Sequence, residues 1–173
     1  MADEREAWRR YEDESQRREL ARREWMPAPL GARIVLAAGG GRAFWVDAFR
    51  GYPDGVTFLT HYRWVAAGRE LEDPDAWPAL GGHPPADDPV TVTADVDGRE
   101  APRSSAAFGG HALHTGSGNG LPGIATAEWW LPEVPRASLT LAFSHPSLGL
   151  AGSAVVDARG WADEIAAHAI RIE

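Results

Sequence analysis

The sequence predicts a mainly β protein, an immunoglobulin-like antiparallel β-sandwich with a charged N-terminal helix and a short C-terminal helix. Apolar and polar residues alternate with a period of two in residues 56–64 and 138–144, which is typical of strands that bury one face. Further short strand-like segments are separated by turns rich in glycine, proline and aspartate, which favours a sandwich over a parallel α/β sheet. We therefore expect a helix at 1–25, a linker at 26–32 and one sandwich domain at 33–173.

The N-terminal segment is densely charged and contains few apolar residues. Acidic residues stand four positions before arginines in the pairs Glu6/Arg10, Asp13/Arg17, Glu14/Arg18 and Glu19/Arg23. Each such pair stabilises a helix by ~0.2–0.5 kcal/mol. The apolar residues are too sparse for a continuous buried stripe. We therefore expect a protruding helix that is either simply solvated or docked on a partner through Trp8 and Tyr11. Pro27 and Pro29 end it, because proline removes a backbone donor.

The strands and loops of the sandwich follow in order along the chain. Strands are expected at residues 33–38, 43–49, 56–64, 90–96, 126–131, 138–144 and 152–156. The dipeptide at 97–98, Asp-Gly, is a strong hairpin turn. Two segments rich in glycine, proline or acidic residues, 66–89 and 103–123, are expected to be mobile loops.

The closing helix is predicted from the spacing of its apolar residues. Trp161, Ile165, Ala169 and Ile172 recur at helical intervals, so one face should pack on the sandwich. Asp157 can cap the first turn, because its carboxylate can accept from the first free amides. We therefore expect a helix at about 158–170.

Composition excludes several classes of function. The chain contains no cysteine, so disulfides, thiolate metal sites and a cysteine nucleophile are excluded. All 17 basic residues are arginine and the formal net charge is −8, a balance that disfavours binding to nucleic acid or to an anionic membrane surface. No apolar run approaches the length of a membrane span. We expect a cytoplasmic protein, with export by a signal-independent route as the alternative.

Two motifs lie in the predicted sandwich domain. The first runs from Gly51 to Phe58 and ends at Arg63, and the second combines residues 129–135 (WWLPEVP) with 139–143 (LTLAF). Together they resemble the signatures of an uncharacterised family of small actinobacterial proteins. A helix after Asp157 would be the third shared feature, whereas His145-Pro146 stands where members often carry tryptophan-proline. The resemblance is scattered over the sandwich domain and implies a β-sandwich with flanking helices. It implies no activity, so no functional residue is carried over from it.

Histidines and glycines offer the candidates for metal or nucleotide chemistry. His111 and His114 are three residues apart, and His83 and His61 could complete a zinc site with them. No carboxylate is close to His111 and His114 in the sequence to orient such a site, so we interpret the pair as part of a solvated loop. The glycine-rich run at 116–120 lacks the lysine and the following helix of a phosphate loop. We therefore expect no metal, no cofactor and no enzymatic activity, with a histidine-based enzyme as a distant possibility.

Tryptophan, with eight copies, is the residue whose abundance needs an explanation. Trp129 and Trp130 are neighbours on a predicted strand and must point to opposite faces. One of them therefore lies outside the core unless a helix, a loop or a partner covers it. The aromatic residues either all pack, with one under a terminal helix, or form an exposed platform. The candidate interaction residues are Trp8, Tyr11, Trp45, Trp64, Trp129 and Trp130.

These observations lead to two hypotheses of function. The first is a non-catalytic protein-interaction or structural module that contacts another protein or a second copy of itself through the outward tryptophans and the N-terminal helix. The alternative is a binder of a small molecule or a carbohydrate that uses the same aromatic side chains, and this would require a mostly apolar pocket beside them.

Overall fold

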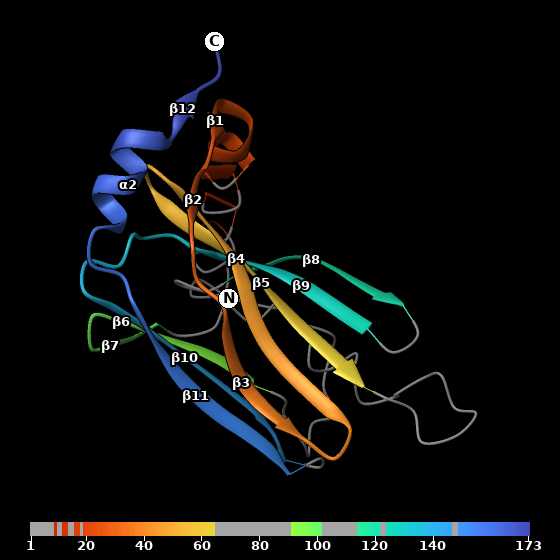
Figure 1. Ribbon diagram of the computed structural model, residues 1–173. Coiled ribbons are helices and arrows are strands. Elements are labelled where there is room, and N and C mark those ends of the chain that lie inside the picture. The colour runs from red at the N-terminus through yellow and green to blue at the C-terminus, as the bar shows by residue number, and fades with distance from the viewer. Residues whose placement is uncertain are drawn as a thin grey trace.

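The computed structural model is an antiparallel β-sandwich with a short helix near each end of the chain (Figure 1). It describes residues 19–64, 91–101, 114–121, 124–146 and 149–173, and the isolated N-terminal residues 9, 12, 13, 16 and 17. These isolated residues and residues 19–24 are helical. The prediction of a mainly β fold with one short helix before and one short helix after the sandwich in the chain is therefore confirmed.

The described residues form two sheets and a small ribbon. In the first sheet, β2 and β3 lie one after the other along the same edge of β4, and the order continues β4-β5-β9-β8. Its strands are β2 (Ala28–Leu30), β3 (Ile34–Gly39), β4 (Arg42–Tyr52), β5 (Gly55–Trp64), β8 (His114–Leu121) and β9 (Ile124–Leu131). The second sheet has the order β11-β10-β6-β7 and consists of β6 (Thr91–Val96), β7 (Arg99–Ala101), β10 (Ser138–His145) and β11 (Leu150–Asp157). The ribbon pairs β1 (Trp25–Met26) with β12 (Ile170–Arg171).

The inner faces of the two sheets form the main core. Every second residue of β10 is buried, from Leu139 to His145, which confirms the alternation predicted for residues 138–144. Across the two layers, Phe44 stacks on Phe143 with ring centroids 3.9 Å apart. The alternation predicted for residues 56–64 is confirmed as far as Tyr62, because the described inward side chains of β5 are buried: Val56, Phe58, Thr60 and Tyr62.

The two sheets meet along one edge, where β3 lies beside β11 (Figure 1). Leu36 and Ala37 are both buried there, because the register of β3 shifts between Val35 and Ala37. Gly152 of β11 permits the close approach, since a Cβ atom at this position would collide with the carbonyl oxygen of Leu36. This contact fixes β3, and with it the outer face that β3 shares with β4.

A β-bulge in β4 decides which of its residues face outward. The register shifts between Asp47 and Arg50, and Ala48 has a φ of 53°. The extra residue reverses the alternation of the strand. Trp45 and Asp47, which precede the bulge, therefore share the outer face. The residues of β4 in the main core, on both sides of the bulge, are Phe44, Val46 and Phe49.

The N-terminal helix covers one end of the outer face of the first sheet. Ala21 of this helix forms a second buried cluster with Tyr52 and Trp130. Arg22 adds an ion pair of 3.0 Å to Glu128 of β9. The expectation of a protruding helix is therefore wrong for residues 19–24, because an aromatic pair on the sheet gives this short apolar stretch a surface on which to pack.

Helix α2 (Trp161–His168) packs against one end of the sandwich through Trp161 and Ile165, both buried as predicted. The predicted cap is wrong, however. The N-cap residue is Gly160 in the left-handed conformation, without a side-chain hydrogen bond. The Asp157 carboxylate instead accepts hydrogen bonds from the backbone and the guanidinium of Arg159. The short arginine contact therefore takes the oxygens that a cap would need.

The β1–β12 ribbon ties the N-terminal segment to the end of the chain. Trp25 is paired with Arg171, and the backbone N–H of Ile172 donates to the carbonyl of Glu24. The chain becomes extended at Ala169 to form this ribbon, so α2 is shorter than predicted. Ile172, predicted for the buried face of the helix, is exposed for the same reason.

Two further segments differ from the predictions. The predicted loop at 103–123 is wrong for residues 114–121, which form β8 and pair with β9. Its glycines have low strand propensity, but the ladder of backbone hydrogen bonds offsets this. The predicted linker at 26–32 contains β2, paired with β4. Residues 66–89 and 102–113 lie outside the described residues.

Candidate functional site

The two neighbouring tryptophans of β9 are both buried. Trp129 is 0% and Trp130 is 1% exposed, so neither offers a surface to a partner, and both leave the set of interaction residues proposed from the sequence. Trp129 belongs to the main core, whereas Trp130 points to the outer face and is covered by the N-terminal helix. The structure thus has one tryptophan under a terminal helix, which is one of the two alternatives left open above.

The other predicted interaction residues differ in how far the structure describes them. Trp8 and Tyr11 lie outside the described residues. Trp64 belongs to β5, but its side chain is also outside the described part. Trp45 is described in full and lies half-buried on the outer face of β4. The candidate site is therefore built around Trp45.

Trp45 belongs to a row of cross-strand neighbours on the outer face of the first sheet. Val35 of β3 is paired with Trp45, Trp45 with His61 of β5, and His61 with Thr126 of β9. The rings of Trp45 and His61 stack with centroids 4.8 Å apart and an interplanar angle of 11°. Val35 is 61% exposed. The row therefore presents a flat aromatic pair with an exposed aliphatic side chain beside it.

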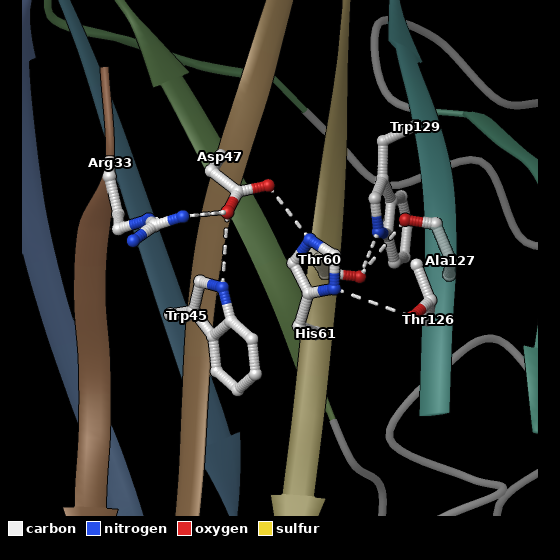
Figure 2. Close-up of polar contacts among 8 residues, drawn as sticks. All are labelled: Arg33, Trp45, Asp47, Thr60, His61, Thr126, Ala127 and Trp129. Atoms are coloured by element: carbon white, nitrogen blue, oxygen red, sulfur yellow. Dashed lines mark hydrogen bonds and ion pairs between the residues drawn. The ribbon is translucent and has the colours of Figure 1, made fainter. Parts of the chain in front are cut away.

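Asp47 holds the aromatic pair in place, as Figure 2 shows. Its Oδ1 lies 2.8 Å from Nε2 of His61. Its Oδ2 accepts the indole N–H of Trp45 at 3.2 Å and the Nε–H of Arg33 at 3.3 Å. Asp47 follows Trp45 by two residues and so lies on the same face of β4. One carboxylate thereby fixes three side chains, which come from β4, from β5 and from the segment before β3.

These hydrogen bonds also fix where the protons lie. An ionised carboxylate only accepts, so His61 donates from Nε2, and in the neutral ring Nδ1 accepts from the Thr126 hydroxyl at 3.3 Å. Partial burial by itself raises the pKa of Asp47. The hydrogen bond and charge of His61, the Trp45 N–H and the Arg33 charge outweigh burial and hold the pKa below its ordinary value. Asp47 is therefore an anion at neutral pH.

The opposite face of the same strands carries a purely internal contact. The indole N–H of Trp129 donates to the Thr60 hydroxyl at 2.8 Å, and this hydroxyl donates to the carbonyl of Ala127 at 3.3 Å (Figure 2). Thr60 is fully buried. This chain satisfies the polar groups of a core tryptophan, and it braces β5 against β9 behind the outer row.

We name Arg33, Val35, Trp45, Asp47 and His61 the Trp45 patch. The side chain of Arg33 is 74% exposed, whereas those of Asp47 and His61 are 18% exposed. The patch therefore has a packed, hydrogen-bonded centre and an accessible rim made by an arginine and a valine.

Sequence reasoning missed most of this patch. It named Trp45 as an interaction residue and His61 only as a zinc or catalytic candidate, and it did not single out Arg33, Val35 or Asp47. One signal was available, because Asp47 follows Trp45 by two residues in a strand and must share its face. The pairing of Trp45 with His61 was not available, since it depends on the bulge between them.

The structure gives no support to the zinc site considered from the sequence. The described residues contain no group of three or more histidine, aspartate or glutamate side chains that could hold a metal ion. His83 and His111 lie outside the described residues, and only the backbone of His114 is described, in β8. The glycine-rich run at 116–120 lies in the same strand. Within the described part of the chain, no helix is long and apolar enough to cross a membrane.

Comparison with protein-family models, with curated proteins and with solved structures finds no match to this chain. The resemblance to an actinobacterial family therefore stays a prediction. The function must be argued from the geometry of the chain itself.

Proposed function

We propose that this protein is a non-catalytic protein-binding module and that the Trp45 patch is its recognition surface. The observation that carries the proposal is the Trp45–His61 stack, held by Asp47 on an outer sheet face that the described part of the chain leaves half-open. Tryptophan and arginine are the residue types most enriched among those that dominate binding energy at protein interfaces. A stack already fixed by hydrogen bonds loses little conformational freedom when a partner binds.

The hydrogen bonds of the patch favour a protein partner over a carbohydrate. A sugar-binding face needs free donors and acceptors for the hydroxyl groups of the ligand. Both oxygens of Asp47 and both ring nitrogens of His61 already have partners within the chain. What remains accessible is the rim, an arginine and a valine, which suits a protein surface.

The same bonds argue against a catalytic role for the histidine–aspartate pair. In catalytic pairs of this kind, the aspartate holds one ring nitrogen and the other faces the reacting group. Here the second nitrogen of His61 is bonded to Thr126 within the sheet. The pair is thus better suited to orient Trp45 than to transfer a proton.

Site-specific photo-crosslinking in the host cell tests the proposal. A photoreactive amino acid replaces Val35 in the patch or, as a matched control, Val155 on the outer face of β11, which is 66% exposed. We expect a covalent protein adduct from position 35 and none from position 155. The mass of the adduct separates a second copy of this chain from another protein. The absence of an adduct at position 35, or equal adducts at both positions, would contradict the proposal.

The dependence of the adduct on Trp45 sharpens the test. In a chain that carries both the photoreactive residue at position 35 and Trp45→Ala, we expect the adduct to decrease at least tenfold, because the stack supplies the contact area. An undiminished adduct would mean that position 35 touches its partner without help from the patch.

A further inference from the structure

A cleft of about 840 Å³ lies at the end of the sandwich that α2 covers. Its walls come from α2, the turn between β4 and β5, the turn between β6 and β7, and the connection between β9 and β10. None of the residues of the Trp45 patch lines it. Its size is within the range of small-molecule sites, ~300–1,000 Å³.

The floor of the cleft is apolar and contains small side chains. Ala162, Ile165 and Ala166 of α2 face it, together with Trp25 and Val134. Alanines on this side of α2 leave open the space that larger residues would fill. The floor can therefore accept an apolar chain or ring without displacing any side chain.

The charged side chains of the cleft differ in whether they form hydrogen bonds or ion pairs with described residues. Glu133 accepts from Arg99 at 2.7 Å. Asp97 accepts from the backbone N–H groups of residues 136–138, and these bonds hold its pKa below the ordinary value. The guanidinium of Arg136 has no hydrogen bond or ion pair to any described residue. The backbone of Arg136 is thus fixed by Asp97 while its charge is left available.

Asp54 also lines the cleft, and its carboxylate is opposite in charge to Arg136. Desolvation raises the pKa of its carboxyl group, while a hydrogen bond from its own backbone and the charge of Arg17 act in the opposite direction. A second anion close to Asp54 would be unfavourable. An anionic ligand is therefore expected to place its charge at Arg136 and its apolar part on α2.

We propose that this cleft binds a small amphipathic anion, with a carboxylate or phosphate group on Arg136 and an apolar chain over Ala162, Ile165 and Ala166. Arginine suits this role because its planar guanidinium can make two parallel hydrogen bonds to such a group. The formal net charge of −8 disfavours unspecific attraction of anions. Binding of an anion would therefore point to a particular site.

Three probes with one apolar chain and different head groups test the proposal: decanoate, decylamine and decanol. Their affinities for the full chain are measured by isothermal titration calorimetry below the concentration at which they form micelles. We expect decanoate to bind at one site and more tightly than decanol. Tighter binding of decylamine than of decanoate, or no binding of any probe, would overturn the proposal.

Variants locate the site. Arg136→Gln should weaken decanoate roughly 10- to 100-fold, the usual range for loss of a charged hydrogen bond, and leave decanol unchanged. Asp54→Asn should tighten decanoate, because it removes a like charge. Arg63→Gln, at an exposed arginine of β5 outside the cleft, is the control and should change nothing. Equal losses in the Arg63 and Arg136 variants would contradict the assignment of Arg136.

A fourth variant tests the apolar floor. Ala166→Trp should cover the apolar floor and abolish binding of both decanoate and decanol, while circular dichroism confirms that the chain is folded. Since Ala166 is exposed to the cleft, the substitution does not disturb the main core. If decanol still binds to this variant, its alkyl chain does not lie on the apolar floor of the cleft, which would contradict the proposal.

Discussion

The outer face of the first sheet carries tryptophan at two places, and the chain treats them differently. Trp130 is covered by the N-terminal helix and Tyr52 and is 1% exposed. Trp45 lies on the same face, stacked on His61 and hydrogen-bonded to Asp47, but it stays half-open. A tryptophan on an outer sheet face can thus be stabilised in two ways. Other residues can cover it, or its indole N–H can be hydrogen-bonded while one face of its ring is stacked. The second solution leaves a surface, which is why function is assigned to the Trp45 end.

The largest expected effect separates the two tryptophans by stability. Trp130→Ala should destabilise the fold by ~3–5 kcal/mol, because it opens a cavity under the N-terminal helix. Trp45→Ala should cost less than ~1.5 kcal/mol, since it removes a half-exposed ring and one hydrogen bond. Urea unfolding followed by circular dichroism measures both. Equal costs would show that Trp45 is a core residue like Trp130 and would remove the distinction.

The next effect concerns Asp47, which bonds to Trp45. Asp47→Asn should cost ~1–3 kcal/mol, because an amide oxygen that accepts from Trp45 and Arg33 turns the N–H₂ group toward the N–H donor of His61. Asp95→Asn, at a half-buried aspartate of β6 that accepts one hydrogen bond from the backbone of Gly98, is the control with the same chemical change. If the two variants lost equal stability, Asp47 would not be the centre of the patch.

The stability that Asp47 contributes should depend on pH, and the direction of this dependence can be tested. The hydrogen bonds and charges around Asp47 hold its pKa below the ordinary value in the folded state. Its contribution to stability is therefore present above about pH 4 and is lost as the pH falls through the folded-state pKa. The difference between wild type and Asp47→Asn should therefore be constant at neutral pH and shrink below pH 4. Urea midpoints between pH 2 and 7 measure it. A difference that grows in acid would mean that the carboxyl group is destabilised in the fold.

The smallest expected effect concerns the N-terminal helix that covers Trp130. Arg22→Gln breaks the ion pair to Glu128 and should cost roughly 0–1 kcal/mol, because the arginine is 37% exposed. Hydrogen exchange at the amides of residues 19–24 should increase in this variant, while exchange in β4 and β5 stays unchanged. Increased exchange throughout the first sheet would show that the N-terminal helix supports the whole fold and is more than a cover.

The sequence was sufficient for the layers and insufficient for the site. Alternation in β5 and β10 predicts strands with one buried face, because burial requires a period of two. It cannot predict pairing across a bulge. Phe44 and Phe49 are five residues apart and both lie in the main core, whereas in a regular strand residues five apart point to opposite faces. The bulge at Ala48 resolves this conflict and sets Trp45 opposite His61.

The errors at the chain ends and in the glycine-rich segment have a similar cause. β2 and the β1–β12 ribbon are held by hydrogen bonds to strands that do not adjoin them in sequence, and local propensity does not register such partners. β8 pairs with the next strand, β9, but its glycines have low strand propensity and so concealed it. The loss of the predicted Asp157 cap is a local competition, because Arg159, only two residues away, binds the same oxygens. These contacts lower the pKa of Asp157 to about 2.

Oxidative labelling of tryptophan, read by mass spectrometry, tests the central claim most directly. The isolated chain and the chain in an extract of its host are labelled in parallel, and modification of Trp45 and Trp130 is compared. In the isolated chain, Trp45 should react and Trp130 should stay protected; in the extract, Trp45 should become protected too. Equal protection of both residues in the isolated chain, or unchanged reactivity of Trp45 in the extract, would contradict a binding surface at Trp45.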